Sequence, residues 1–281
     1  MRIEVNGVRI FFDVEGAKLV PDGPRMREKP TLILLHGGPG NDHSTLMPFF
    51  SQFADIAQVV FIDQRANGRS DRGSEDNWDL AQWGDDVRAF CDILEIERPI
   101  VLGVSFGGMV AQSYATRHPD HPGKLILSST RSRRNIEGSV AEFARLGGPV
   151  VGQIARAYFE SPTAETGAAF RQHCRPYYFG RSQPDPDVDA RQVRGDSHLL
   201  LHYRQHETRM NFLPDLARIA CPTLVMGGGD DPICPIDDMA DTAAALPTHL
   251  VRFERFPGCG HFLRYDDPIR TLRVIRDFIL S

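Results

Sequence analysis

The sequence predicts an α/β protein: a mostly parallel β-sheet with helices on both faces and an inserted helical subdomain. Short, uninterrupted apolar runs alternate along the chain with stretches in which apolar residues recur at helical spacing. Such runs are typical of strands that are buried on both faces of a parallel sheet. The alternation breaks over residues 131–211 and then resumes. We therefore predict a core of residues 1–130 and 212–281, with a helical cap of residues 131–211 inserted in it.

The first strands are predicted from a hairpin signal near the N-terminus. Residues 2–15 alternate apolar and polar around Asn6-Gly7, a dipeptide that favours a two-residue turn between antiparallel strands. Residues 16–30 are rich in proline, glycine and charge, so we expect a linker there. Buried strands are predicted, in chain order, at residues 31–35, 59–62, 98–102, 125–127, 223–226 and 250–253.

Helices are predicted where apolar residues recur every three or four positions. Residues 79–96 have this spacing, and a second helix over residues 109–115 follows the strand at 98–102. The closing helix begins at Asp267-Pro268, a cap residue followed by proline at the first helical position. The residues predicted on its buried face are Ile269, Leu272, Ile275 and Ile279.

The inserted segment is predicted to be helical. Residues 131–211 contain helical patches and no buried strand, with a loop rich in proline and aspartate around residues 184–187. Its apolar and aromatic side chains are numerous enough for a packed subdomain. An insertion between two strand–helix units is expected to lie over the carboxyl ends of the strands, where ligands bind in open α/β sheets.

Composition and charge exclude several classes of protein. Hydrophobic residues make up 41% of the chain and charged residues 25%, which is ordinary for a globular protein. The formal charge of −5 comes without a basic run, so no nucleic-acid partner is expected. No apolar stretch is long enough to span a membrane, and the N-terminus lacks the apolar core of a signal peptide. The five cysteines are dispersed and odd in number, as in reduced proteins, so we expect a cytoplasmic protein.

The functional hypothesis begins at residues 103–107, GVSFG, between a predicted strand and a predicted helix. In that context G-x-S-x-G is typical of a turn that presents a nucleophilic serine. The sharp bend requires small neighbours where strand and helix meet, which accounts for Gly103 and Gly107. The serine oxygen then lies at the N-terminus of a helix, whose dipole favours negative charge. We therefore predict that Ser105 is the catalytic nucleophile.

A serine hydroxyl needs a base that takes its proton. Of the ten histidines, only His36 and His261 come at the end of a predicted sheet strand. His36 belongs to a glycine-rich turn that is expected to supply backbone donors, so we assign it a structural role. His261 lies in the loop after the last strand and is predicted to be the base.

The base in turn needs a carboxylate that orients it. Asp230 and Asp231 follow the strand after the cap, which gives the chain order Ser–Asp–His. Asp231 directly precedes a rigid turn, residues 232–235, and is favoured over Asp230 for that reason. Asp63 also ends a strand but comes before the serine, so we expect it to hold its turn or to pair with Arg65.

An acyl-transfer site also needs N–H donors for an oxyanion. The amide of Phe106, directly after the serine, is predicted to be one donor. Gly38 is predicted to supply the second, with Gly37 as the alternative. The sequence has no phosphate-binding loop and no histidine or cysteine cluster with metal-ligand spacing. We therefore expect neither a metal nor a cofactor.

Taken together, these motifs resemble the α/β-hydrolase superfamily over essentially the whole chain, and within it the proline-iminopeptidase-like branch, peptidase family S33. Residues 36–40 (HGGPG) match a signature of that branch. Residues 63–70 (DQRANGRS) are similar to its DQRGxGxS segment, and residues 228–235 are similar to its acid turn. The resemblance implies an α/β-hydrolase fold with a helical cap and no cofactor. The triad that it implies is Ser105, Asp231 and His261.

Two segments depart from that branch. Ala66 replaces the first glycine of DQRGxGxS, and Val104 and Phe106 replace the glycine and tryptophan of its GGSWG elbow. The resulting elbow is more similar to those of carboxylesterases, lactonases and related small-substrate hydrolases. The peptidases of the branch also hold the free amino terminus of the substrate with cap glutamates. We expect most glutamates in this cap to be surface charges, with Glu207 the first exception; they are Glu137, Glu142, Glu160, Glu165 and Glu207.

We therefore expect a serine hydrolase that cleaves an ester of a small to medium substrate, as a carboxylesterase or lactonase, through an acyl-enzyme. The aromatics and many arginines of the cap favour an apolar or acid-tolerant pocket. The alternative is a proline-iminopeptidase-like aminopeptidase acting on short peptides, which needs an anionic pocket for a protonated amine. A non-catalytic ligand-binding homologue is the third interpretation. The expected partner is a small ester, lactone or short peptide, and a homo-oligomer stays open.

Overall fold

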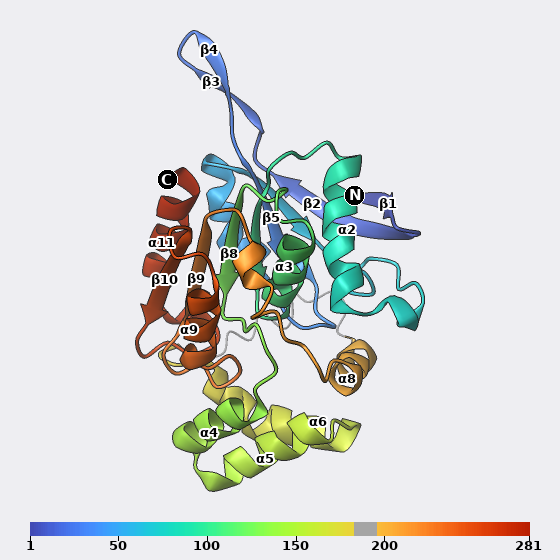
Figure 1. Ribbon diagram of the computed structural model, residues 1–281, viewed down its shortest axis with the longest axis vertical. Coiled ribbons are helices and arrows are strands. Elements are labelled where there is room, and N and C mark those ends of the chain that lie inside the picture. The colour runs from blue at the N-terminus through green and yellow to red at the C-terminus, as the bar shows by residue number, and fades with distance from the viewer. Residues whose placement is uncertain (183–195) are drawn as a thin grey trace.

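The computed structural model describes residues 1–182 and 196–281, and its centre is one eight-stranded sheet (Figure 1). The strands of this sheet are β1 (Arg2–Val5), β2 (Val8–Glu15), β5 (Thr31–Leu35), β6 (Gln58–Ile62), β7 (Ile100–Val104), β8 (Lys124–Ser128), β9 (Thr223–Gly228) and β10 (Val251–Phe256). They lie in the order β1-β2-β6-β5-β7-β8-β9-β10. The pairs β1–β2 and β2–β6 are antiparallel, and every other pair is parallel. The predicted class, a mostly parallel α/β sheet, is confirmed.

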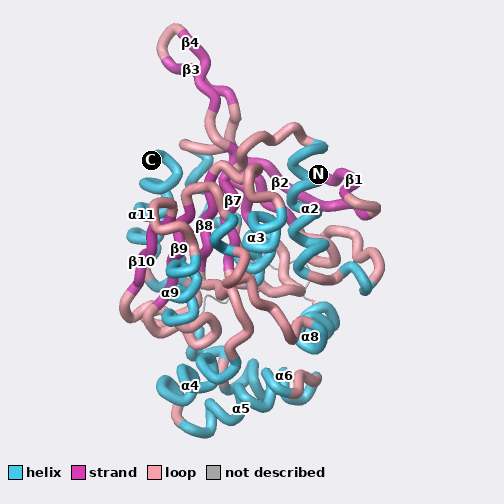
Figure 2. Tube along the Cα trace, viewed as in Figure 1, coloured by secondary structure: helices cyan, strands magenta, loops and turns pink. Residues whose placement is uncertain are grey.

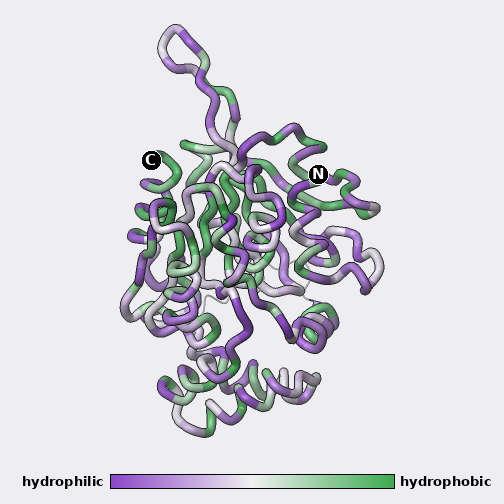
Figure 3. Tube along the Cα trace, in the orientation of Figure 1, coloured by the Kyte–Doolittle hydropathy of each residue, from purple (hydrophilic) through white to green (hydrophobic). Residues whose placement is uncertain are grey.

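The buried strands separate two apolar cores, one on each face of the sheet. In β5, Ile33 and Leu35 pack into the first core, while Leu32 and Leu34 pack into the second, because successive residues of a strand alternate between faces. Green, the colour of hydrophobic residues, is accordingly concentrated in the centre of the sheet in Figure 3. The first core is covered by α2 (Leu80–Ile93), α3 (Phe106–Arg117) and α9 (Ile236–Ala245), the second by α1 (Met47–Phe50) and α11 (Pro268–Leu280).

The last helix begins where the sequence predicts, and its predicted buried face is correct except at Ile269. Asp267 caps α11 by accepting a hydrogen bond from the amide of Arg270, with Pro268 at the first position. Ile269, predicted on the buried face, is 81% exposed. The buried residues are Thr271, Val274, Ile275, Phe278 and Ile279. Ile275 and Ile279 are thus buried as predicted, and Leu272 packs against the second core. The first turn differs because a polar residue, Thr271, takes the buried position, which apolar periodicity does not count.

Residues 16–30 are not a plain linker. They contain a second antiparallel hairpin, β3 (Leu19–Asp22) and β4 (Arg25–Glu28), that projects from the sheet on the side opposite the cap (Figure 1). Gly23 takes a φ of 58° at its turn, a conformation that glycine adopts without strain. The strands of this hairpin are largely exposed, so they lack the apolar alternation from which a strand is predicted.

Between β8 and β9 the chain leaves the sheet and forms a helical insertion, as predicted (Figure 2). Its helices in the described ranges are α4 (Ile136–Gly147), α5 (Pro149–Glu160), α6 (Ala164–His173), the 3₁₀ turn η4 (Arg175–Tyr178) and α8 (Ser197–His206). Phe143, Phe159 and Phe170 pack together with edge and tilted ring contacts in its centre. The loop predicted around residues 184–187 lies outside the described residues. No helix in the described ranges is both long and apolar enough to cross a bilayer.

Shorter helical turns join the main elements of the core. They are η1 (His43–Thr45), η2 (Ser51–Asp55), η3 (Glu75–Asn77), η5 (Leu216–Arg218) and α10 (Leu263–Asp266). All five cysteines are buried and free of disulfides, as reduced thiols would be. The insertion faces the end of the sheet at which the parallel strands terminate (Figure 1), which is the edge where Ser105 follows β7.

Candidate active site

Ser105 lies at a strained turn between β7 and α3. Its backbone has φ 55° and ψ −118°, a conformation that a residue with a side chain adopts only when its surroundings impose it. The surroundings here are two close approaches of backbone. A Cβ on Gly107 would overlap the carbonyl oxygen of Leu35, and a Cβ on Gly103 would overlap that of Gly107. The glycines that the sequence singles out therefore occupy positions where no larger residue fits.

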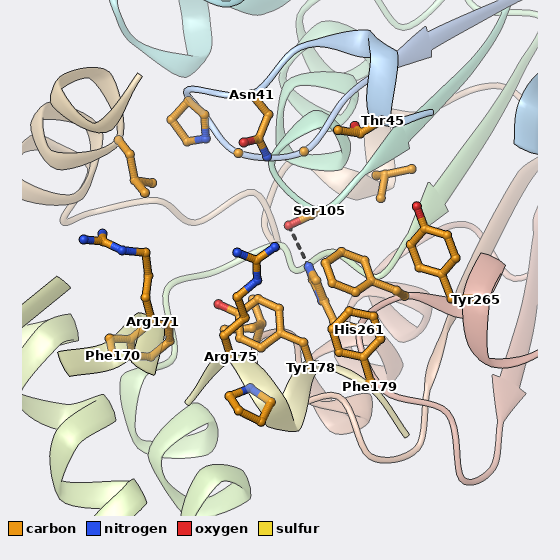
Figure 4. Close-up of a pocket in the computed structure, with 18 of the residues that line it drawn as sticks. Asn41, Thr45, Ser105, Phe170, Arg171, Arg175, Tyr178, Phe179, His261 and Tyr265 are labelled. Atoms are coloured by element: carbon orange, nitrogen blue, oxygen red, sulfur yellow. Dashed lines mark hydrogen bonds between the residues drawn. The ribbon is translucent and has the colours of Figure 1, made fainter. Parts of the chain in front are cut away.

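Ser105, His261 and Asp231 form a continuous chain of hydrogen bonds. With a proton on Nδ1, His261 donates to Oδ2 of Asp231 at 2.8 Å. Oγ of Ser105 donates to Nε2 of His261 at 3.0 Å, the bond that Figure 4 shows as a dashed line. Asp231 is 1% exposed, and its other oxygen accepts the amides of Ile233 and Cys234. The turn after Asp231 thus fixes the carboxylate in one orientation.

The side chain of Asp230, the alternative acid, does not contact His261. Its carboxylate is partly exposed and forms an ion pair with Arg145 of α4 at 2.7 Å. Its amide bonds to the carbonyl of Cys259, so the residue links the acid turn to the loop that carries His261. The structure brings Asp231 and not Asp230 into contact with His261.

The loop of His261 is held by Tyr178 and Asp266, for which no functional role is predicted from the sequence. The amide of His261 donates to the carbonyl of Tyr178 at 2.7 Å, and the ring of Tyr178 lies edge-on to the imidazole at 5.5 Å. The carboxylate of Asp266 accepts the amides of Gly260, Gly180 and Ser182. It thereby ties the loop to the cap segment after η4.

Burial raises the pKa of Asp266, but the hydrogen bonds that it accepts lower the pKa more, so its value lies below the ordinary one. Its partners are mostly backbone amides, which no sequence pattern records. The only signal was a second aspartate, Asp266, directly before the helix cap Asp267.

The turn of residues 36–40 lies beside the serine. Burial lowers the pKa of His36, whose Nδ1 lies 2.8 Å from the carbonyl oxygen of Gly37, so the residue is part of the turn. A Cβ on Gly37 would come within 3.3 Å of the Cβ of Ser105. Within the described residues, neither the amide of Gly38 nor that of Phe106 takes part in a hydrogen bond. The ring of Phe106 turns into the core, 4.9 Å from Trp83.

The expected pairing of Asp63 with Arg65 is wrong. Asp63 accepts hydrogen bonds from Nδ1 of His43 at 2.6 Å and from the amide of Arg69, while Arg65 pairs with Asp86 through two bonds of 2.7 and 2.8 Å. Burial alone would lower the pKa of His43, but the hydrogen bond and charge of Asp63 outweigh it, and the pKa is raised. Asp63 does hold its own turn, as the alternative expectation had it.

A cavity of about 540 Å³ opens above Ser105 and His261, between the core and the cap (Figure 4). Its described walls are largely apolar and aromatic, with Phe170, Tyr178 and Phe179 among them. The charged side chains that line it are all arginines: Arg171, Arg175, Arg204 and Arg264. None of the five cap glutamates lines it. A cavity of this size accommodates a small organic molecule.

One group of side chains has the donor types of a metal site. Atoms of Asp231, Cys234 and His261 lie within 4.8 Å of one another. The carboxylate and the imidazole are already bonded to each other, and burial raises the pKa of the Cys234 thiol well above its usual range. A protonated thiol is a poor metal ligand, so these residues fit a hydrogen-bonded triad better than a metal site.

A family model for the alpha/beta hydrolase fold matches residues 30–268. The match covers most of the chain, and the strand order and cap agree with it, so this protein belongs to the alpha/beta hydrolase fold family. The resemblance that the sequence suggested is confirmed.

Within that family the chain is similar to the proline iminopeptidase of Lactiplantibacillus plantarum, with 31% identity over 297 aligned positions that cover 98% of each chain. Two solved structures share its fold. The proline iminopeptidase of Mycobacterium smegmatis has a TM-score of 0.77 at 21% identity and covers 99% of this chain and 97% of its own. An esterase from Exiguobacterium antarcticum has a TM-score of 0.76 at 18% identity, with coverage of 100% and 99%.

Proposed function

We propose that this hydrolase is a serine esterase that cleaves small to medium carboxylic esters or lactones through Ser105, His261 and Asp231. The observation that carries the proposal is the hydrogen-bond chain from Asp231 through His261 to Ser105 at the floor of the cavity. In this proposal residues 131–211 form the cap, and residues 1–130 and 212–281 form the catalytic core.

The geometry supports a two-step acyl transfer. His261 takes the proton of Ser105 as Oγ attacks the ester carbonyl, and Asp231 stabilises the imidazolium that forms. The amides of Gly38 and Phe106 stabilise the oxyanion, aided by the N-terminus of α3. The imidazolium then returns the proton to the leaving alcohol, which leaves an acyl-serine. Water, deprotonated by His261, attacks that ester, and the acid departs while Ser105 regains its proton.

The second candidate is an aminopeptidase acting on short peptides, favoured by the 31% identity to a proline iminopeptidase and by residues 36–40 (HGGPG). Such an enzyme needs carboxylates that receive the protonated amino terminus of its substrate. The described walls of the cavity offer none. Glu137 and Glu160 instead pair with Arg156, and Glu142 pairs with Arg145, on the outside of the cap. The esterase is therefore preferred.

The nucleophile is tested with a fluorophosphonate probe, which labels activated serines covalently. We expect the wild type to be labelled, Ser105→Ala to be silent, and Ser161→Ala, at an exposed serine that ends α5, to be labelled like the wild type. An unlabelled wild type, or a labelled Ser105→Ala, overturns the proposal.

The bond is tested by comparing p-nitrophenyl acyl esters with the p-nitroanilides of proline and alanine. We expect turnover of the esters and no release from the anilides. Rapid release from proline p-nitroanilide would replace the esterase with the aminopeptidase.

A further inference from the structure

The arginines on the outside of the cap and those in the cavity differ in their partners. Arg145 pairs with Glu142 and Asp230, and Arg156 pairs with Glu137 and Glu160. Within the described residues, no carboxylate lies within ion-pair distance of the cavity-lining side chains of Arg171, Arg204 and Arg264. In the described part of the chain, Arg145 and Arg156 are thus neutralised by carboxylates in direct contact. These three cavity arginines have no such contact there, and the charge of Glu207 acts on Arg204 only from beyond ion-pair distance.

Arg204 reaches the cavity from α8 across aromatic rings. Its guanidinium carbon lies 5.7 Å from the ring centre of Tyr158 and 5.3 Å from that of Phe159. Aromatic faces hold a cation in place without neutralising it. Its Nε is buried and has no hydrogen-bond partner in the part of the chain that the structure describes. A buried N–H without a partner is costly. The same residue lines the cavity, so an anion there would offset part of its charge.

Arg264 repeats the pattern at another wall of the same cavity. The residue is 8% exposed, and its guanidinium lies 4.5 Å from the ring centre of Tyr265 and 5.1 Å from that of Phe262. Its Nε is also buried without a described partner. Taking a guanidinium out of water without a counter-ion is unfavourable, and burial lowers its pKa accordingly. An anion in the cavity would supply the missing charge.

We propose that the substrate is itself an anion, an ester or lactone that carries a carboxylate, and that the positive charge of Arg204 and Arg264 at the cavity walls attracts that carboxylate while Ser105 attacks the ester carbonyl. This inference rests on the esterase proposed above. It names the substrate class: half-esters of dicarboxylic acids, esters of hydroxy acids, or lactones bearing a carboxylate. A guanidinium binds a carboxylate through two parallel N–H bonds, which fixes orientation as well as affinity.

The test uses two esters that differ in one group, the p-nitrophenyl monoester of adipic acid and p-nitrophenyl hexanoate. We expect the wild type to prefer the adipate ester in kcat/KM by about 10-fold or more, the value of one hydrogen bond to a charged group. Arg204→Met and Arg264→Met should each reduce this preference. Arg145→Met, which removes an outer and fully paired cation, should leave the preference unchanged.

A second pair places the carboxylate on the alcohol side, 4-carboxyphenyl hexanoate against 4-carbamoylphenyl hexanoate. Preference for the anion in this pair alone assigns the carboxylate to the leaving group, and preference in the adipate pair alone assigns it to the acyl group. Absence of preference in both pairs overturns the inference.

A third measurement needs no variant and covers the case in which an arginine variant fails to fold. Adipamic acid, the half-amide of adipic acid, should inhibit the wild type competitively and at least about 10-fold more strongly than hexanamide. Equal inhibition contradicts an anion site.

If the fluorophosphonate probe labels Ser105 and the neutral ester is cleaved while no anion is preferred, this inference fails and the esterase stands. If neither ester is cleaved and no probe reacts, the esterase itself fails.

Discussion

The carboxylate of Asp266 accepts the amide of Gly260 at 2.7 Å, one residue before His261. The same carboxylate accepts the amides of Gly180, Arg181 and Ser182, which follow the last 3₁₀ turn of the cap. One side chain therefore fixes the backbone on both sides of the interface between the His261 loop and the cap.

Replacing Asp266 with asparagine is expected to destabilise the fold by about 2–3 kcal/mol, because hydrogen bonds to a charged acceptor are stronger than those to an amide. The side-chain NH₂ of asparagine would also face backbone donors. Urea denaturation at pH 7 measures the loss. Asp267→Asn is the matched control, because asparagine caps a helix about as well as aspartate, and its stability should stay close to that of the wild type.

The same contact predicts a pH dependence. The pKa of Asp266 in the folded protein lies below its ordinary value, so its contribution is complete above the unfolded pKa, about 3.9. The contribution is lost as the pH falls from there through the folded pKa. The stability difference between the wild type and Asp266→Asn should therefore shrink below about pH 4. A constant difference from pH 7 to pH 3 would argue against this role of the charge.

Asp231→Asn should lower kcat by about 10⁴-fold, because an amide at this position no longer selects the imidazole tautomer that Ser105 needs. Asp230→Asn removes only a partly exposed ion pair with Arg145, so kcat should stay close to the wild-type value. Turnover of p-nitrophenyl acetate and thermal melting of both variants provide the comparison. A large kcat loss in Asp230→Asn with an intact Asp231→Asn enzyme would reverse the assignment.

Arg65→Met should cost about 3–5 kcal/mol of stability, because it leaves the buried carboxylate of Asp86 without its two-bond partner. Arg117→Met breaks an ion pair of similar geometry with Asp85 at the surface, and its cost should be below about 1 kcal/mol. Chemical denaturation of the two variants compares the loss of unfolding free energy at a buried ion pair with the loss at an exposed pair of similar geometry. Equal losses of stability would show that burial does not increase the cost of breaking the Arg65–Asp86 pair.

Gly107→Ala should prevent folding or cost well above the ~1–3 kcal/mol of ordinary overpacking, because the new Cβ would meet the carbonyl oxygen of Leu35, which is backbone. Gly167→Ala is the opposite case. Gly167 lies inside α6, and a Cβ there would come 3.4 Å from the ring of Tyr158, an ordinary contact distance. Because alanine favours a helix more than glycine does, the substitution should stabilise the protein by about 0.5–1 kcal/mol. Soluble yield and melting temperature report both outcomes.

The sequence predicts most of the sheet because each central strand is a run such as residues 31–35, apolar at nearly every position. It misses α9, because Asp238 and Thr242, two of the four buried residues of this helix, are polar and do not count in a search for apolar spacing. It also misses the β3–β4 hairpin, whose strands are mostly exposed to solvent. Sequence patterns reveal an element through the spacing of its buried apolar residues, so an element with few such residues goes undetected.

The residues proposed as catalytic were found from turn chemistry and chain order, and the structure brings Ser105, Asp231 and His261 into contact. The residues that hold these three side chains and their loops in place were not predicted from the sequence. Asp266 accepts hydrogen bonds from backbone amides, which no sequence pattern records. The contact of Asp63 with His43 joins the end of β6 to η1, and the sequence does not reveal how far apart these two segments lie in space. Arg204 and Arg264, which have no carboxylate within ion-pair distance among residues 1–182 and 196–281, could be recognised only once the partners of the other arginines were known.

The bond from the amide of His261 to the carbonyl of Tyr178 limits how a substrate can enter. Lifting residues 178–182 away from the core would break this bond and those to Asp266, and the imidazole would lose its place beside Ser105. The enzyme cannot admit substrate by raising that part of the cap and remain ready to react. Substrate entry and product release are therefore expected to involve other cap elements, while residues 178–182 stay in place against the His261 loop.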